Sequence, residues 1–493
     1  MTMTPAYYGI VHFMQKYGIP NGGRGKLELE NVKRSSLEIP DPFPFENALK
    51  LDETFASCKT TNVLDILRRI ELILSGYLER IWSELNEREK KVLARVPVID
   101  CYEEVLFNCI LHTYLESGTP VVQKAFWPNG KKFVVCLTHD VDEIKKRYQY
   151  ITRSLRCIKS GDLRGLKNQL ISLTRKIVLK EEPYWTFEKI IDLERRLNVR
   201  STFYFLNESS EVKLLDRSTW RHYGRKYDIT CGKVAEVIKR LHSEGWEIGL
   251  HGSFHSYNDI NKLRYEKDVL ERVLGAKVHG IRQHSLNLDI PNTWRIHTRI
   301  GLEYDTTLGF NDCVGFRWGT CFPFHPIDKE TNRPMKLLEI PLIIEDIALF
   351  SYDDPWGVCV DVIDTVKKYG GVLTLLWHHS VFNELEYPGW AEIYKRIIKV
   401  CKEEDAWVTN AYEIAKWWKM REESELKCEY DGRTLKIKPY PRNQRHFIKV
   451  YLPKGNTLEV SSANAEVICE DENSVTISTM NLEERGEITL RIR

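Results

Sequence analysis

The chain is predicted to be an α/β protein whose central part forms a closed or partly closed (β/α) barrel of seven or eight units. Short apolar runs alternate there with amphipathic helical stretches, a pattern typical of parallel strands joined by helices. The length of 493 residues exceeds one ordinary domain. We therefore expect an N-terminal mainly helical domain at residues 1–130, the barrel at 131–422, and a small C-terminal all-β domain at 423–493.

The N-terminal region is predicted to be helical after an irregular start. Residues 63–85 and 101–115 carry apolar side chains at a spacing of three to four, which places them on one face of a helix. We interpret this region as an accessory domain.

The central region contains eight candidate strands. Seven or eight strand–helix units in this length favour a closed or partly closed barrel, with active groups at the C-terminal strand ends. An open doubly wound sheet is the alternative. Helices are expected between strands, for example at residues 185–197, 232–244 and 259–274. The strand candidates are residues 133–137, 202–206, 246–250, 278–282, 302–305, 338–342, 372–377 and 407–409.

The C-terminal region changes to strand-like alternation separated by polar turns. This pattern predicts a small sandwich, which we interpret as a structural cap or an assembly module. Its candidate strands are residues 446–452, 458–461, 475–478 and 488–492.

The composition argues against several classes of partner. A net charge of +2 makes no case for a nucleic-acid partner. No apolar run approaches the roughly 18 residues of a membrane span, and residues 1–25 lack the pattern of a signal peptide. We expect a cytoplasmic protein without a transmembrane segment, compatible with a homo-oligomer. The 12 cysteines form no Cys-x-x-Cys pair, which favours free thiols.

One segment is strongly basic. Residues 144–180 hold eleven Lys or Arg and a single acidic residue, Asp162. A solvated helical insertion is the favoured interpretation. The alternative is a patch for an anionic substrate or a membrane surface.

Two motifs at predicted strand ends suggest a metal-assisted hydrolytic site. Asp140 and Asp142 follow the strand at 133–137, and His251 and His255 follow the strand at 246–250. Histidines at i and i+4 lie one helical turn apart and can reach one ion, and two histidines with one carboxylate form a standard open ligand set. The remaining carboxylate can take a proton from water. Zinc is the expected divalent metal, and cobalt, nickel, iron or manganese would fit the same set.

Later strand ends supply further polar groups. Arg282 ends the strand at 278–282, and an Arg beside a base carboxylate keeps that carboxylate ionised and oriented. His378 follows the strand at 372–377 and is positioned to protonate a leaving group.

These motifs resemble the polysaccharide deacetylases, the NodB-like group of carbohydrate esterase family 4, over about residues 131–415. Residues 138–142 (Thr-His-Asp-Val-Asp) are similar to the family run Thr-Phe-Asp-Asp-Gly, which supplies a base and a metal ligand. Residues 251–255 are similar to the family's His-Ser/Thr-x-x-His, and residues 375–378 (Leu-Leu-Trp-His) to its late histidine run. The resemblance implies a distorted (β/α) barrel of about seven units.

The sequence departs from the family pattern at three points. Val141 replaces the second family aspartate, so either Asp142 is the ligand through a local bulge or Asp140 binds the metal. The residues after Arg282 match poorly, which implies a different substrate pocket. The acid that orients the catalytic histidine has no clear counterpart, and Asp346 and Asp305 are the candidates.

The resemblance implies a metal-dependent hydrolase that removes an N- or O-linked acetyl group from a carbohydrate or sugar-containing substrate. Asp142, His251 and His255 are expected to hold the metal. Asp140 is expected to act as base, with Arg282 holding it. His378 is expected to act as acid, with Asp346 as a further catalytic-site residue. One alternative is an amidohydrolase that acts on a small nitrogenous molecule at the same site. Another is a degenerate barrel used for binding or assembly.

Overall fold

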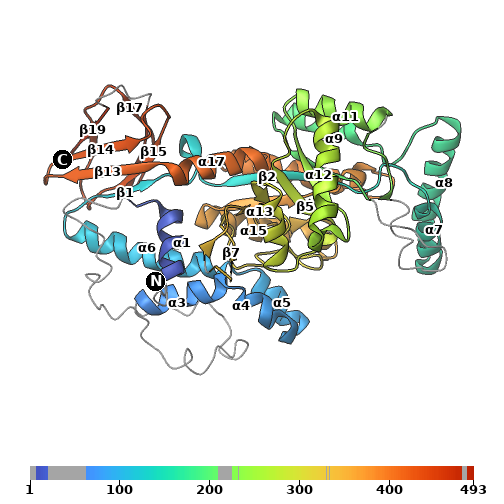
Figure 1. Ribbon diagram of the computed structural model, residues 1–493, viewed down its shortest axis with the longest axis horizontal. Coiled ribbons are helices and arrows are strands. Elements are labelled where there is room, and N and C mark those ends of the chain that lie inside the picture. The colour runs from blue at the N-terminus through green and yellow to red at the C-terminus, as the bar shows by residue number, and fades with distance from the viewer. Residues whose placement is uncertain are drawn as a thin grey trace.

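The structure is a computed structural model that describes residues 7–19, 63–208, 225–230, 232–328, 330–331, 333–479 and 486–493. A helical N-terminal part, a central α/β part and a C-terminal β part follow one another along the chain (Figure 1). Among the helices of these segments, none combines the length and apolar character that a bilayer span demands.

Nine strands of the described chain form the central sheet, and all their pairings are parallel. Eight strands form one path, and β12 (Trp407–Thr409) pairs with β2 beside it. The path runs in the order β10 (Ile344–Glu345), β11 (Val372–Leu376), β2 (Val134–Val141), β3 (Thr202–Leu206), β4 (Glu247–Gly252), β5 (Gly280–Gln283), β6 (Tyr304–Asp305) and β9 (Leu338–Glu339).

The sheet curves back on itself. Its two end strands, β9 and β10, are separated along the chain only by residues 340–343. A flat path of eight strands would be roughly 34 Å wide, whereas five peptide steps reach at most about 18 Å. The sheet therefore curls into a distorted barrel. This confirms the predicted fold class and rules out the alternative, an open doubly wound sheet.

Helices cover the outside of this sheet, as the alternation of the sequence predicts. Their apolar faces and the strands are buried in one continuous hydrophobic core. The helices are α9 (Phe187–Leu197), α11 (Gly232–Ser243), α12 (Ile260–Leu274), α13 (Asn292–Arg299), α14 (Asp346–Leu349), α15 (Pro355–Tyr369), α16 (Trp390–Glu403) and α17 (Ala411–Glu423).

The N-terminal helices share the barrel's core. Ile66 and Leu106 belong to the same buried cluster as Val135 and Leu375 of the sheet. The region predicted as a separate domain is therefore packed directly against the barrel. Its helices are α1 (Tyr7–Tyr17), α3 (Val63–Leu74), α4 (Tyr77–Ile81), α5 (Glu87–Ala94) and α6 (Val98–Glu116).

A buried charge cluster joins these helices to the barrel. Lys16 Nζ lies 2.8 Å from Asp100 Oδ1 and 2.6 Å from Glu103 Oε2, and all three side chains are buried. Asp100 also accepts hydrogen bonds from the Thr320 hydroxyl and the Cys321 backbone N–H. The cluster thus connects α1, α6 and the barrel loop at residues 320–321.

The C-terminal part consists of two antiparallel four-stranded sheets around a second apolar core. One strand, β1 (Val121–Lys124), comes from the chain that precedes the barrel, so the sandwich is built from both ends of the sequence. One sheet has the order β13 (Glu425–Tyr430), β14 (Thr434–Tyr440), β19 (Ile488–Ile492), β16 (Leu458–Val460); the other has β1, β15 (Phe447–Tyr451), β18 (Ser474–Thr479), β17 (Ala465–Asp471).

The basic segment forms a helical hairpin. Helices α7 (Gln149–Ser160) and α8 (Leu163–Val178) pack against each other between β2 and α9. Figure 1 shows them protruding at the end of the molecule opposite the C-terminal sheets. The predicted helical insertion is therefore observed.

The charge cluster yields a stability prediction. Lys16→Met should lower the free energy of unfolding by about 3–5 kcal/mol, because two buried carboxylates lose their cation. The measurement is the midpoint of chemical denaturation. Lys90→Met is the matched control, because Lys90 pairs with the exposed Glu87 and should contribute under about 1 kcal/mol. Equal midpoints for the two variants would contradict the prediction.

Candidate metal and catalytic site

The predicted site residues gather at one edge of the barrel. Asp140 lies near the C-terminal end of β2, and Asp142 follows that strand. His251 and Arg282 face each other in the register of β4 and β5, and His378 follows β11. Because all these strands are parallel, their C-terminal ends meet at the same edge, which is where barrel enzymes build their sites.

Three side chains converge at the centre of this edge. His251 Nε2 lies 3.0 Å from Asp142 Oδ1 and 3.1 Å from His284 Nδ1, and the last two atoms are 3.3 Å apart. Ligands at about 2.1 Å from a tetrahedral ion lie about 3.4 Å from one another. The spacing and the donor set of two imidazoles and one carboxylate therefore fit one divalent ion.

The surroundings prepare these groups as ligands. The Nδ1–H of His251 donates to the Arg282 carbonyl over 2.8 Å, so its Nε2 lone pair faces the cluster. Burial would raise the pKa of Asp142, but His284 and His251 outweigh it and hold that pKa well below its usual value. The carboxylate is thus ionised and able to bind a cation.

The structure brings His284, not His255, to this cluster. His255 is exposed, and its ring packs edge-on against Phe254 at 4.9 Å between centroids. The i, i+4 argument assumes a helix, but here β4 ends at Gly252 and the chain turns. His284 follows β5 two residues after Arg282, and that strand end was the signal in the sequence.

Val141 does not displace Asp142 from the site. Asp140 is the next-to-last residue of β2 (Val134–Val141), and Asp142 continues the chain directly after the strand, two positions on. Both carboxylates reach the same atom of the site, His251 Nε2. Asp140 Oδ2 lies 3.7 Å from His251 Nε2, whereas Asp142 Oδ1 lies closer, at 3.0 Å.

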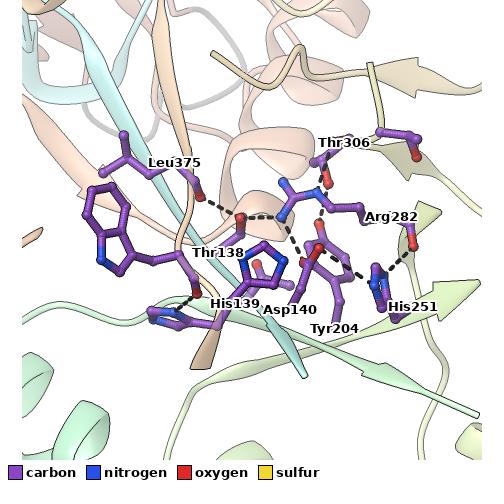
Figure 2. Close-up of polar contacts among 12 residues, drawn as sticks. Thr138, His139, Asp140, Tyr204, His251, Arg282, Thr306 and Leu375 are labelled. Carbon is purple, nitrogen blue, oxygen red and sulfur yellow. Dashed lines mark hydrogen bonds and ion pairs between the residues drawn. The ribbon is translucent and has the colours of Figure 1, made fainter. Parts of the chain in front are cut away.

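Asp140 is held by Arg282, as the sequence suggested. The guanidinium Nη1 lies 3.0 Å from Asp140 Oδ1 and donates to the Thr138 hydroxyl over 2.6 Å, while Nε donates to the Thr306 carbonyl (Figure 2). The guanidinium also lies over the Tyr204 ring, 4.9 Å from its centroid. Because Arg282 is fully buried, these contacts fix the direction of the Asp140 carboxylate.

His378 is oriented by Asp346. The His378 backbone N–H donates to Asp346 Oδ2 over 2.6 Å, and its Nδ1 lies 2.8 Å from Asp346 Oδ1. Its Nε2 lies on the side of Asp142, 3.8 Å from Asp142 Oδ2. The other candidate, Asp305, contacts His297 instead, at 3.1 Å.

The pKa of His378 follows from these neighbours. Burial alone would lower it, but the negative charges of Asp346, Asp142 and Asp140 raise the pKa well above its usual value. The imidazole therefore carries a proton that it can donate. This state suits a general acid.

Two further buried groups were not assigned from the sequence. Glu345, which precedes Asp346, is buried, and burial raises its pKa to about 8. Its Oε2 has no hydrogen-bond partner among the described residues. A strand end followed by Glu345-Asp346 was visible in the sequence, but only the fold shows that Glu345 is buried.

The second group is His379. Its Nδ1 lies 3.2 Å from the Asp140 carbonyl oxygen, and burial lowers the pKa of His379 to about 4.

Comparison with known proteins finds similarity in solved structures. No family model and no curated protein matches the chain. A polysaccharide deacetylase from Mycobacterium smegmatis is 18% identical, with a TM-score of 0.40, over 60% of this chain and 94% of that one. A probable polysaccharide deacetylase from Pseudomonas aeruginosa PAO1 is 15% identical, with a TM-score of 0.39, over 60% of this chain and 94% of that one. An allantoinase is also 15% identical, with a TM-score of 0.39, over 60% of this chain and 93% of that one.

Proposed function

We propose that the protein is a metal-dependent hydrolase that removes an acetyl group from a sugar-containing substrate. The convergence of Asp142, His251 and His284 within hydrogen-bonding distances of one another carries this proposal. The motif at residues 138–142, which resembles that of the deacetylases, supports the choice of an acetyl group. Zinc is the proposed ion, because two imidazoles and one carboxylate form an open zinc site.

The bound ion would polarise the acetyl carbonyl and favour the ionised form of a water molecule. Asp140 takes the proton of the attacking water at Oδ2, because Oδ1 is occupied by Arg282. The water oxygen bonds to the acyl carbon, and the C–N or C–O bond to the sugar breaks. His378 delivers its Nε2 proton to the departing nitrogen or oxygen, which yields acetate and the free amine or alcohol.

Metal content tests the ligand set. The wild-type protein should contain about one metal ion per chain, and His284→Ala should lose it, because a ligand is removed. His255→Ala is the matched control and should keep the metal, since His255 is exposed and is not one of the three residues of the cluster. The measurement is elemental analysis of the purified variants. Loss in His255→Ala with retention in His284→Ala would restore the ligand set expected from the sequence.

Turnover of acetylated sugars tests the base. Asp140→Asn should lower kcat by about 10²–10⁴-fold, because the amide cannot accept the proton of water. Its metal content should stay near that of the wild type, since Asp142 holds the ion. The measurement combines acetate release with elemental analysis. Metal loss together with activity loss would mean that the two aspartates have exchanged roles.

The pH profile tests the acid. His378 acts only when protonated, so kcat/KM should fall as the pH rises through its raised pKa. Asp346→Asn removes the main charge that raises this pKa, so the alkaline limb should move to lower pH. The measurement is the pH dependence of kcat/KM for both proteins. An unmoved alkaline limb in Asp346→Asn would contradict the assignment of His378.

A further inference from the structure

The hairpin α7–α8 exposes an unusual amount of apolar surface. Nine of the twelve large hydrophobic residues that are exposed in the described segments lie between residues 151 and 179. On α7, Ile151, Leu155 and Ile158 are 67%, 53% and 61% exposed. On α8, Leu170 and Ile177 are both about 60% exposed. A cluster of this kind in a soluble domain marks an interaction surface.

These apolar residues form one stripe on each helix. Ile151, Leu155 and Ile158 follow one another at spacings of four and three, and Leu170, Leu173 and Ile177 at three and four. Residues at these spacings lie on the same face of a helix. Each helix thus presents a continuous apolar face to solvent.

The face that the hairpin turns toward the protein is polar. Lys146 Nζ, just before α7, donates to the buried Gln169 of α8 over 2.6 Å and forms an ion pair with Glu386. Arg153 Nε lies 3.1 Å from the same Glu386 carboxylate. Asn168 donates to the Leu385 carbonyl over 3.0 Å. The hairpin is therefore inverted relative to an ordinary surface helix, whose apolar face packs on the core.

The charge on this surface is almost entirely positive. Residues 144–180 hold eleven Lys or Arg and one acidic residue, and Arg156, Lys159 and Lys167 are exposed on the two helices. At the base of the hairpin lies a cavity of about 980 Å³. Its charged lining residues are mostly basic: Lys145, Arg147, Arg175, Lys180, Lys189, Lys226 and Lys233, beside Glu181, Glu182 and Asp228. Basic side chains thus outnumber acidic ones from the helices toward the body of the protein.

We propose that the outer face of α7–α8 docks on the surface of a membrane that contains anionic lipids. The apolar stripes enter the boundary between head groups and acyl chains, and the lysines and arginines beside them contact the lipid head groups. This combination of an apolar face with Lys/Arg-rich flanks characterises helices that lie in the membrane interface. A second copy of the chain fits less well, because it would bring the same excess of positive charge to the contact.

Vesicle flotation with the full-length protein tests this surface. The wild type should bind phosphatidylcholine vesicles that contain phosphatidylglycerol at least about tenfold better than vesicles of phosphatidylcholine alone. Leu155→Gln with Leu173→Gln should abolish most of this binding, because both side chains are exposed and lie in the stripes. Arg156→Gln with Lys159→Gln should weaken it and reduce its dependence on salt.

Tyr265→Gln with Val467→Gln is the matched control, because both side chains are exposed apolar groups outside the hairpin. This variant should bind vesicles like the wild type. Equal binding of the Leu155/Leu173 variant and the wild type, or no binding of the wild type to anionic vesicles, would overturn the proposal. Size-exclusion chromatography with light scattering tests the alternative that a second copy of the chain covers the surface, because it measures the oligomeric state. A wild-type dimer that the leucine variant converts to a monomer, without vesicle binding, would assign the surface to a second copy.

Discussion

The buried ion pair between Arg282 and Asp140 is the contact on which the site depends. Arg282 extends from β5 to β2, which are separated in the sheet by β3 and β4, and its guanidinium passes over the Tyr204 ring of β3. Such a contact across the interior requires a curved sheet. Leaving a buried cation without its anion destabilises the fold by several kcal/mol. The ion pair therefore favours the curved sheet, and the curved sheet in turn allows the ion pair to form. The same contact leaves one oxygen of Asp140 facing the candidate ligands Asp142 and His251.

The site combines groups whose environments set opposite protonation states. Asp142 is kept ionised by two imidazoles, and His378 is kept protonated by Asp346. Glu345 lies beside Asp346 and His378, and burial raises its pKa. Pairs of titratable groups pushed apart in this way assign acid and base roles within one small volume. The chemistry that we propose uses this separation: one group binds a cation while another donates a proton.

The helical hairpin shows that one segment can satisfy its polar groups inside and leave its apolar groups outside. Lys146 and Arg153 are anchored by Glu386, so the hairpin has a defined attachment to the barrel. The cost is an apolar surface in contact with water, which the hydrophobic effect penalises. A covering partner removes this penalty. Helix α7 begins at Gln149, shortly after Asp142, so the chain leads from the edge of the sheet that holds the candidate site directly into the hairpin.

The local pattern of the sequence was sufficient for the strands, the helices and most of the site. Apolar runs that end in Asp140, His251, Arg282 and His378 predicted both the parallel sheet and the edge where its polar groups meet. This succeeds because parallel strands place their C-terminal ends together whatever the loops do. Only the tertiary structure shows that His284, and not His255, lies beside Asp142 and His251. A spacing of four residues places two histidines on one face of a helix, but here β4 ends at Gly252 and the chain turns.

The sequence by itself therefore determined the barrel, the edge that holds the candidate site and the residue types available there, because these follow from periodicity along the chain. Only the tertiary structure decided three other features. Asp346, and not Asp305, is the partner of His378. Strand β1 pairs with the C-terminal sandwich. The apolar faces of α7 and α8 are exposed. Each depends on contacts between segments far apart in the chain, about which local periodicity carries no information.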